Sequence, residues 1–285
     1  MIFDFTYKLA RKWLSPYLYN TISYDLLKRR KGYERIETYE NIFKHYKENG
    51  IDFKEKTVIE LGSGLQYFTA FFFLLDGAKK VFLIEPKLVF SLSELKSSLD
   101  IFNSQYGSKL TIEDAANRIE CYSDLAGLKG NLKCEVDVIC SYTVLEHVIN
   151  LPSIFAECAK ILNRNGRCYH LIDLSDHTYQ VFARLPFLAG LNQKRPLYHL
   201  RYSKKLFEFV NDPKCFMNRK LVPEYLLLAE KNGYTISNFS IKTFDGKMKI
   251  HPDLIEGYSP NDSKFRALTL SLSLLKSSNS NSQDR

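Results

Sequence analysis

The sequence lacks any apolar run that approaches the roughly 20 residues needed to span a bilayer, so we expect no membrane-spanning helix. The first residues also lack the uninterrupted apolar core of a secretory signal, because charges at Asp4, Lys8 and Arg11 interrupt them. Both absences favour a cytoplasmic protein.

Cysteine pairs with metal-binding or redox spacing are missing as well. None of the six cysteines belongs to a C-x-x-C pair or shows zinc-finger spacing. Several lie among apolar residues, where a thiol behaves as a small hydrophobic side chain. We expect all six to be reduced, which agrees with a cytoplasmic location: Cys121, Cys134, Cys140, Cys158, Cys168 and Cys215.

Positive charge is present but unevenly distributed. Residues 1–35 carry eight basic and three acidic residues of a chain whose net charge is +8, and six aromatic residues lie in the first 20 positions. This segment could form an amphipathic helix on an anionic surface, peripheral at the inner membrane face. The favoured alternative is a helix that packs its aromatic side chains against the rest of the chain.

A strand, a glycine turn, a helix and a second strand are predicted between Thr57 and Pro86. The first strand leads directly into Gly62-Ser63-Gly64, where two glycines permit a sharp turn and a close approach by a ligand. An apolar helix over Leu65–Leu75 and the second strand follow, and that strand ends in Glu85. This acid lies about twenty residues beyond the glycines, where a ribose-binding carboxylate is expected.

The glycine pattern departs from a dinucleotide fingerprint, because the third glycine is replaced by Tyr67. In the strand before the turn, Glu60 would repel a pyrophosphate and favour a cationic ligand. The run Val58–Gly64 resembles the first motif of class I S-adenosylmethionine-dependent methyltransferases, and Leu83–Pro86 is similar to their second.

The resemblance implies S-adenosylmethionine as the cofactor, with the glycines beside its methionine part and the acid after strand two on its ribose. It implies that Asp124, after strand three, receives the adenine amino group, although a helix-capping role is equally open. Residues 136–174 resemble the family's strand four, helix and strand five, and Ser141–Val148 match the region near the reactive end of the cofactor. The expected cofactor-binding residues are Glu60, Gly62, Ser63, Gly64, Glu85, Pro86, Asp124, Ser141 and His147. Tyr33 or Tyr39, on a helix predicted over Tyr33–Asn49, could cover the cofactor or pack in the core.

The implied fold is a doubly wound α/β sheet of class I methyltransferase type. The 285 residues, 45 % of them hydrophobic, suffice for one domain with additions. We expect a helical extension over 1–50, the methyltransferase domain over 51–274 and a disordered, serine-rich tail over 275–285. An insertion after strand five, over 175–220, is long enough to form a cap that binds substrate at the carboxyl edge of the sheet.

Two histidines and two aspartates lie within eight residues around the start of this insertion: His170, Asp173, Asp176 and His177. We expect His177 to act as a catalytic base that Asp173 or Asp176 orients. A metal site built from the same four groups is an alternative, and so are turn-stabilising aspartates with His170 buried in strand five.

The acceptor is constrained by further patterns. The Asp/Asn-Pro-Pro-aromatic string of enzymes that methylate DNA bases is absent after strand four, and no RNA-binding module is present, so we expect no nucleic-acid partner. The insertion resembles more loosely a group of class I methyltransferases found beside glycan-assembly enzymes. A small-molecule or glycan acceptor follows, most consistent with O-methylation of a sugar or of a lipid-linked glycan intermediate. The alternatives are a quinone or polyketide methyltransferase and a non-catalytic S-adenosylmethionine-binding scaffold.

Overall fold

The computed structural model of the chain describes residues 36–88, 90–132, 134–177, 196–211, 216–246, 250–254 and 262–277. The N-terminal aromatic segment with Tyr33, the part of the cap over 178–195 and the tail from 278 lie outside these residues. Among the described residues no helix combines the length and the hydropathy needed to cross a membrane. The five cysteines in this part of the chain are free thiols.

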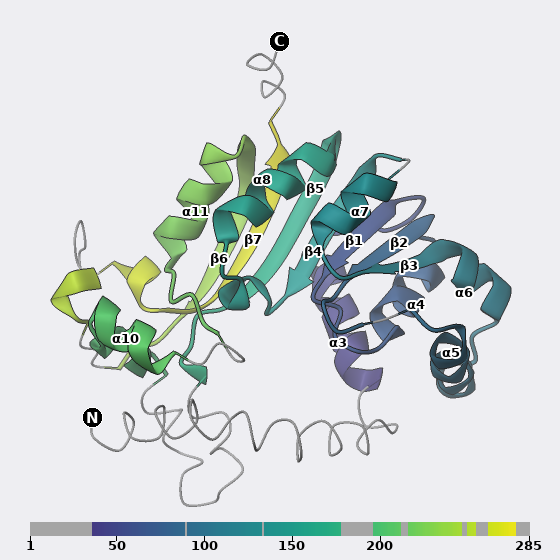
Figure 1. Cartoon of the computed structure of the whole chain (residues 1–285), viewed down its shortest axis with the longest axis horizontal. Helices are drawn as coiled ribbons and strands as arrows, with labels where there is room; N and C mark the ends of the chain where they lie inside the picture. The colour runs from purple at the N-terminus through teal and green to yellow at the C-terminus, as the bar shows by residue number, and fades with distance from the viewer. Residues whose placement is uncertain are drawn as a thin grey trace, which may run out of the picture.

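Seven strands form one sheet in the order β3-β2-β1-β4-β5-β7-β6 (Figure 1). The first five are parallel, while β7 runs antiparallel to both of its neighbours. This order confirms the doubly wound sheet and the reversed final hairpin. The strands are β1 (Thr57–Leu61), β2 (Lys80–Ile84), β3 (Ile119–Tyr122), β4 (Val136–Tyr142), β5 (Leu162–Asp173), β6 (Tyr234–Thr243) and β7 (Ala267–Lys276).

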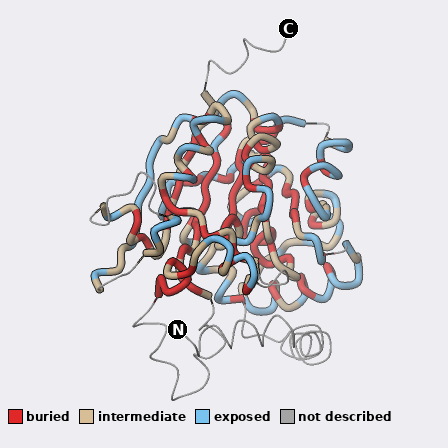
Figure 2. Tube along the Cα trace, turned by 60° about the vertical axis from the view of Figure 1, so that its left-hand side comes forward, coloured by how far each residue is buried: buried red, intermediate tan, exposed pale blue. Residues whose placement is uncertain are grey.

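Helices cover both faces of the sheet, and each face has its own apolar core. One core lies under α3 (Ile36–Glu48), α4 (Phe68–Leu75), α5 (Leu92–Tyr106) and α6 (Ile112–Arg118). The other lies under α7 (Leu125–Asn131), α8 (Leu151–Ile161) and α11 (Val222–Lys231), on the near face in Figure 1. Figure 2 shows the buried strands between helices whose outer surfaces are exposed. Because both faces are covered, the central strands are apolar along their length, as parallel strands require.

The helix before β1 belongs to the first core. In α3, Ile36 and Tyr46 are buried, and the ring of Phe43 stacks on Phe72 of α4 with 5.6 Å between centroids. Such aromatic pairs add about 0.5–1.5 kcal/mol beyond the area they bury. The helical part of the predicted N-terminal extension that the structure describes is therefore integral to the domain.

Several boundaries differ from the prediction. The helix expected from Leu65 begins at Phe68, because the positive φ angles of Gly62 and Gly64 lengthen the turn before it. Strand β7 continues to Lys276, two residues past the predicted end of the domain at 274, because it pairs with β5 and β6 along its full length. The cap contains η5 (Tyr198–Arg201) and α10 (Lys204–Val210).

Candidate active site at the carboxyl edge of the sheet

The glycine turn lies where β1 ends. Gly62 has a φ of +71° and Gly64 a φ of +72°, which only glycine adopts readily. The amide of Gly62 donates to the carbonyl of Ile84, 2.7 Å away, and so fixes the turn beside the end of β2 and Glu85. A β-carbon on Gly62 would lie 2.3 Å from Cγ2 of Val144, so the loop after β4 packs directly on the turn.

A tyrosine from α3 closes the other side of the turn. The hydroxyl oxygen of Tyr39 would lie 3.4 Å from a β-carbon on Gly64, and its ring lies 5.6 Å from that of Phe68. Between the glycines, Ser63 is buried. The turn is therefore bordered by Val144 on one side and by Tyr39 on the other, as expected for backbone that passes close to a ligand.

The carboxyl group of Glu60 lies inside the first core instead of at the edge. Its side chain is 3 % exposed, and burial raises its pKa to about 8, although a hydrogen bond with Thr69 of α4 opposes the rise. Burial thus disfavours the charged form of this carboxyl group, and the expectation that it favours a cationic ligand stays a prediction. Alternation along β1 points Glu60 toward α4.

The acid after β2 is placed as expected. Glu85 is half-buried, and its amide donates to the carbonyl of Tyr122 at the end of β3, 3.0 Å away. Its Oε1 atom accepts from the amide of Lys87 at 3.3 Å, and Pro86 beside it is exposed. Glu85 thus keeps acceptor capacity at the same edge as the glycine turn.

The third acid caps a helix. Asp124 is the N-cap of α7, and its Oδ1 accepts from the amide of Gly127 at 2.7 Å. This bond, followed by one from Ser123, lowers the pKa of Asp124. The capping role is therefore confirmed, and the adenine contact stays a prediction.

Two predicted site residues pair with each other in the second core. Ser141 and His170 are register partners on β4 and β5, and the Oγ and Nδ1 atoms lie 2.8 Å apart. Both side chains are buried, and burial lowers the pKa of His170 to about 4. The imidazole is neutral and enclosed, so His170 is not placed as a catalytic base. Ser141 pairs with Leu61, the last residue before the glycine turn, and its expected cofactor role stays a prediction.

Of the two aspartates expected to orient His177, the structure brings only Asp173 to it. Nε2 of His177 lies 3.1 Å from Oδ2 of Asp173. Burial alone would raise the pKa of this aspartate, but the contact with His177 and hydrogen bonds from Ser175 outweigh it and lower the pKa. Asp176 turns into the cap, where its buried carboxylate lies 3.9 Å from Nδ1 of His199. Because His170 and Asp176 point elsewhere, the four-residue metal site considered for this segment is not assembled.

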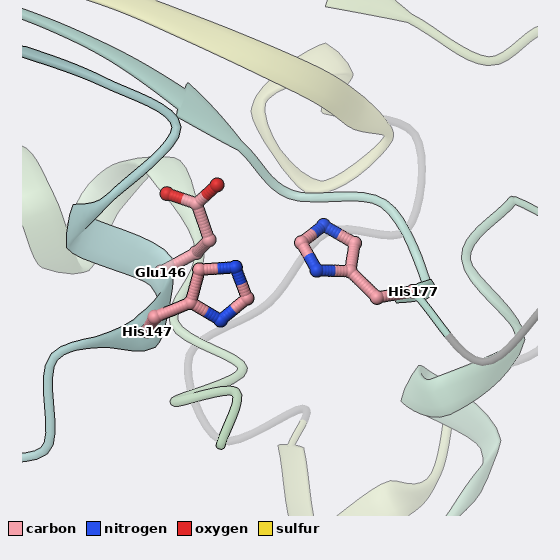
Figure 3. A group of neighbouring side chains, drawn as sticks. All are labelled: Glu146, His147 and His177. Atoms are coloured by element: carbon pink, nitrogen blue, oxygen red, sulfur yellow. The ribbon is translucent and has the colours of Figure 1, made fainter. Parts of the chain in front are cut away.

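A short 3₁₀ helix, η2 (Leu145–His147), brings a further acid to His177. The rings of His147 and His177 face each other, 4.9 Å apart, and Glu146 lies beside His147 (Figure 3). Glu146 is 1 % exposed, and burial raises its pKa to about 8, opposed by nearby backbone amides of Glu146 and Asp173. His147 is exposed beside it, and its Nδ1 lies 2.6 Å from the carbonyl oxygen of Phe216.

Glu146 is the residue that sequence reasoning missed. It stands in a Leu-Glu-His-Val string that indicates the fold, so it received no role of its own. The available signal was its place directly after β4, which puts it at the same edge as the residues that follow β5.

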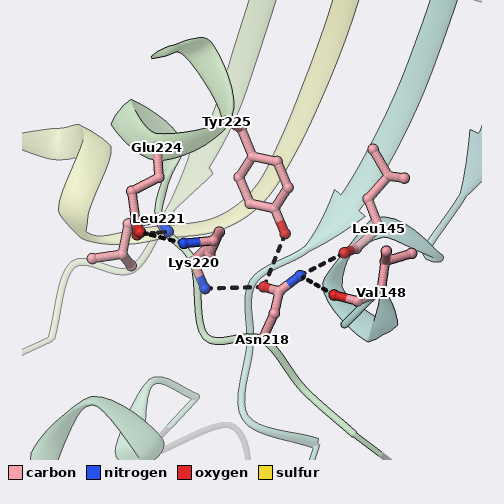
Figure 4. Close-up of polar contacts among 7 residues, drawn as sticks. All are labelled: Leu145, Val148, Asn218, Lys220, Leu221, Glu224 and Tyr225. Atoms are coloured by element: carbon pink, nitrogen blue, oxygen red, sulfur yellow. Dashed lines mark hydrogen bonds and ion pairs between the residues drawn. The ribbon is translucent and has the colours of Figure 1, made fainter. Parts of the chain in front are cut away.

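The cap returns across η2 and holds it (Figure 4). The side-chain amide of Asn218 donates to the carbonyls of Leu145 at 2.6 Å and Val148 at 3.3 Å, and its Oδ1 accepts from Tyr225 of α11. The next residue, Arg219, is buried, donates to the carbonyls of His199 and Tyr202 and lies over the ring of Phe207. The Asn-Arg pair therefore joins the cap to the loop after β4.

No protein-family model matches the chain, and no curated protein matches its sequence. Solved structures resemble it at low identity. The magnesium protoporphyrin IX methyltransferase of Synechocystis PCC 6803, solved with bound SAH, is 12 % identical with a TM-score of 0.48, and the match covers 91 % of this chain and 97 % of that chain. An S-adenosylmethionine dependent methyltransferase of Mesorhizobium loti is 13 % identical with a TM-score of 0.46, over 81 % of this chain and 96 % of that chain. An O-methyltransferase family protein of Burkholderia thailandensis is 12 % identical with a TM-score of 0.45, and the match covers 86 % of this chain and 58 % of that chain. At these TM-scores the likenesses carry no further argument, and the strand order and directions by themselves describe a doubly wound, Rossmann-like α/β sheet.

Proposed function

We propose that the chain is an S-adenosylmethionine-dependent methyltransferase that methylates a hydroxyl of a sugar or of a lipid-linked glycan intermediate. One observation supports this most: the glycine turn and the Asp173–His177 pair lie at one edge of the sheet and are joined by residues 144–147. Val144 packs on the turn, and two residues later the chain faces His177. A donor at the turn and a hydroxyl at the pair would be neighbours, and such positioning is a large part of catalysis.

The residues at the turn fit the cofactor. Gly64 leaves space beside its backbone, because the nearest atom to a β-carbon there would be the Tyr39 hydroxyl oxygen at 3.4 Å, whereas Val144 already occupies the space beside Gly62. Glu85 retains acceptor capacity for ribose hydroxyls, with Ser63 and Pro86 as flanking residues. Asp124 would add an acceptor for the adenine amino group. When bound, S-adenosylmethionine supplies a methyl group on a positively charged sulfur.

Without a metal, His177 is the base that this geometry favours. Its Nε2 faces Asp173, so Nδ1 is the nitrogen that would accept the hydroxyl proton, and the carboxylate would stabilise the resulting imidazolium. A positioned base of this kind contributes about 10²–10⁴-fold.

The glycan acceptor is the finer part of the proposal. It is supported by the resemblance of the insertion to methyltransferases found beside glycan-assembly enzymes, and by a cap that borders the site through Phe216 and Asn218. Contact of the basic N-terminal segment with a membrane would suit a lipid-linked acceptor and stays a prediction.

Calorimetric titration with S-adenosylmethionine tests the proposal. We expect micromolar binding by the full chain and its loss in Gly62→Arg and Glu85→Ala. Two substitutions outside the site serve as controls, Gly130→Ala, where a β-carbon meets nothing within 4 Å, and Glu113→Ala on an exposed turn of α6. Binding would justify a screen of glycan acceptors with His177→Ala as the comparison. A folded chain that binds no cofactor would contradict the proposal.

A further inference from the structure

Glu146, His147 and His177 form a compact group of metal-ligating side chains. One donor atom from each can be chosen so that all of them lie within 4.8 Å of one another. Two come from η2 after β4 and the third follows β5, so the group spans two strand ends (Figure 3). Of these three residues, only His177 is a metal-ligand candidate from the sequence, in a different group with His170, Asp173 and Asp176.

The carboxylate of Glu146 is the first sign that a cation belongs here. The residue is 1 % exposed, and neither carboxylate oxygen has a hydrogen-bond partner among the described residues. A buried carboxylate is costly unless it is paired with a charge or coordinates a metal. No arginine or lysine within the described ranges forms an ion pair with it. One of its carboxylate oxygens instead lies within 4.8 Å of a ring nitrogen of each of the two histidines.

Each of the two imidazoles has one ring nitrogen close to an oxygen acceptor, an arrangement that is common for metal-binding histidines. Nδ1 of His147 must donate to the carbonyl oxygen of Phe216, so its Nε2 carries the lone pair. Nε2 of His177 lies 3.1 Å from Oδ2 of Asp173, an ion-pair contact that is not aligned as a hydrogen bond, and a proton on Nε2 would leave the lone pair on Nδ1. A ligating histidine usually donates its second N–H to a carbonyl or carboxylate in this way, which fixes the tautomer and the ring orientation. Both outer partners are present here.

We propose that Glu146, His147 and His177 bind a divalent transition-metal ion, with Asp173 and the Phe216 carbonyl as outer partners, and that the acceptor hydroxyl binds the open coordination positions of this ion. Two imidazoles and one carboxylate suit Zn²⁺, Mn²⁺, Fe²⁺ or Co²⁺, whereas Mg²⁺ prefers oxygen ligands. Three protein ligands leave positions open, as catalytic sites do. Only the identity of the acceptor rests on the proposed function.

Such an ion would change how the hydroxyl is activated. A hydroxyl bound to a divalent ion loses its proton more readily, as bound water does. The proton leaves to solvent, the oxygen attacks the methyl carbon, and the carbon–sulfur bond breaks with its electron pair remaining on sulfur as an uncharged thioether. His177 then serves as a ligand and not as a free base, and vicinal hydroxyls of a sugar could fill two positions of one ion.

Direct metal binding tests the site without any reference to activity. The full chain, freed of metal by a chelator, is titrated with Mn²⁺ followed by electron paramagnetic resonance and with Co²⁺ followed by visible absorption. We expect one ion per chain, and at least about a tenfold loss of affinity in the isosteric Glu146→Gln and in His177→Ala. The matched control is His251→Ala, which removes another histidine close to an aspartate, 3.4 Å from Asp253. Circular dichroism confirms that each variant is folded.

The outcomes separate the two proposals. A wild-type chain that binds none of Mn²⁺, Co²⁺ and Zn²⁺, or a folded Glu146→Gln that binds them as tightly as wild type, overturns the metal site. Methyl transfer at an unchanged rate after chelation overturns it as well while leaving the methyltransferase function in place. Metal binding by a chain that does not bind S-adenosylmethionine would keep the metal site and end the proposed function.

Discussion

Gly62 and Val144 lie so close that a β-carbon on the glycine would be 2.3 Å from Cγ2 of the valine. We predict that Gly62→Ala lowers both the free energy of unfolding and the affinity for S-adenosylmethionine. Left-handed backbone alone costs about 1–2 kcal/mol for a residue with a β-carbon, and the overlap with Val144 adds to that cost. Urea unfolding and calorimetry measure the two effects.

Gly107 provides the matched control. Its φ is +61° and a β-carbon there meets nothing within 4 Å, so Gly107→Ala carries the backbone strain without the overlap. The double variant Gly62→Ala with Val144→Ala should recover the part of the loss that exceeds the Gly107→Ala cost. If the double variant regains none of the lost free energy of unfolding, the contact between Gly62 and Val144 is not the reason that position 62 needs glycine.

The pKa of Glu60 predicts how stability depends on pH. Burial raises it from 4.5 to about 8, so the folded chain holds this proton more tightly than the unfolded chain does. The contribution of this group to stability therefore falls as the pH rises from about 4.5 to about 8 and is constant above that. We predict that Glu60→Gln, which cannot ionise, reduces this fall by up to about 5 kcal/mol, since each pKa unit corresponds to about 1.4 kcal/mol.

Urea unfolding of both proteins between pH 5 and about pH 9 measures the difference, spanning the window set by the pKa of about 8. Other groups, including Glu146, titrate in both proteins and cancel in the comparison. Parallel curves would mean that Glu60 is ionised in the folded chain, and would support the expectation of a negative charge behind the glycine turn.

From the Ser141–His170 hydrogen bond we predict that Ser141→Ala lowers the free energy of unfolding and leaves the affinity for S-adenosylmethionine unchanged. Ser141→Ala leaves the buried Nδ1 of His170 without its partner at 2.8 Å, which costs about 1–3 kcal/mol. Affinity for S-adenosylmethionine should stay within twofold, because both side chains are buried and bond to each other. A strong loss of affinity at unchanged stability would support the cofactor role expected for Ser141.

The first two strands and the glycine turn could be predicted from sequence because they depend on local patterns, whereas the type of sheet is implied by the resemblance to a family. Thr57–Leu61 is apolar and β-branched and meets two glycines at once, and Glu85 follows the next strand at the expected spacing. Each of these features is decided within a few residues of chain. The predicted start of the helix after the glycine turn, at Leu65, is three residues too early, because the apolar pattern does not show where the turn ends and α4 begins at Phe68.

The side-chain partners in the site could not be predicted in the same way. Asp173 and Asp176 are equivalent in sequence as partners for His177, and only the path of the cap turns one of them toward His199. Glu146 and His177 lie 31 positions apart, and their approach depends on the β4–β5 pairing. Pairings over such distances are set by the folded sheet and not by spacing along the chain.

Asn218 predicts how the cap supports the site. Its amide donates to the carbonyls of Leu145 and Val148, which flank Glu146 and His147, and a carboxylate at this position would face the same two carbonyls without a proton to donate. We predict that Asn218→Asp loosens η2, so that turnover and metal affinity fall about tenfold or more while affinity for S-adenosylmethionine is retained. The glycine turn does not depend on this contact.

Hydrogen exchange provides the structural readout. The amides of His147 and Val148 bond within η2 to Val144 and Leu145, so faster exchange at these two amides should accompany the loss of turnover. Asn131→Asp is the matched control, because it removes an equivalent donor from an exposed helix end on α7. Loss of cofactor affinity together with faster exchange at Gly62 would instead show that the cap supports the whole edge, since Val144 would have moved with η2.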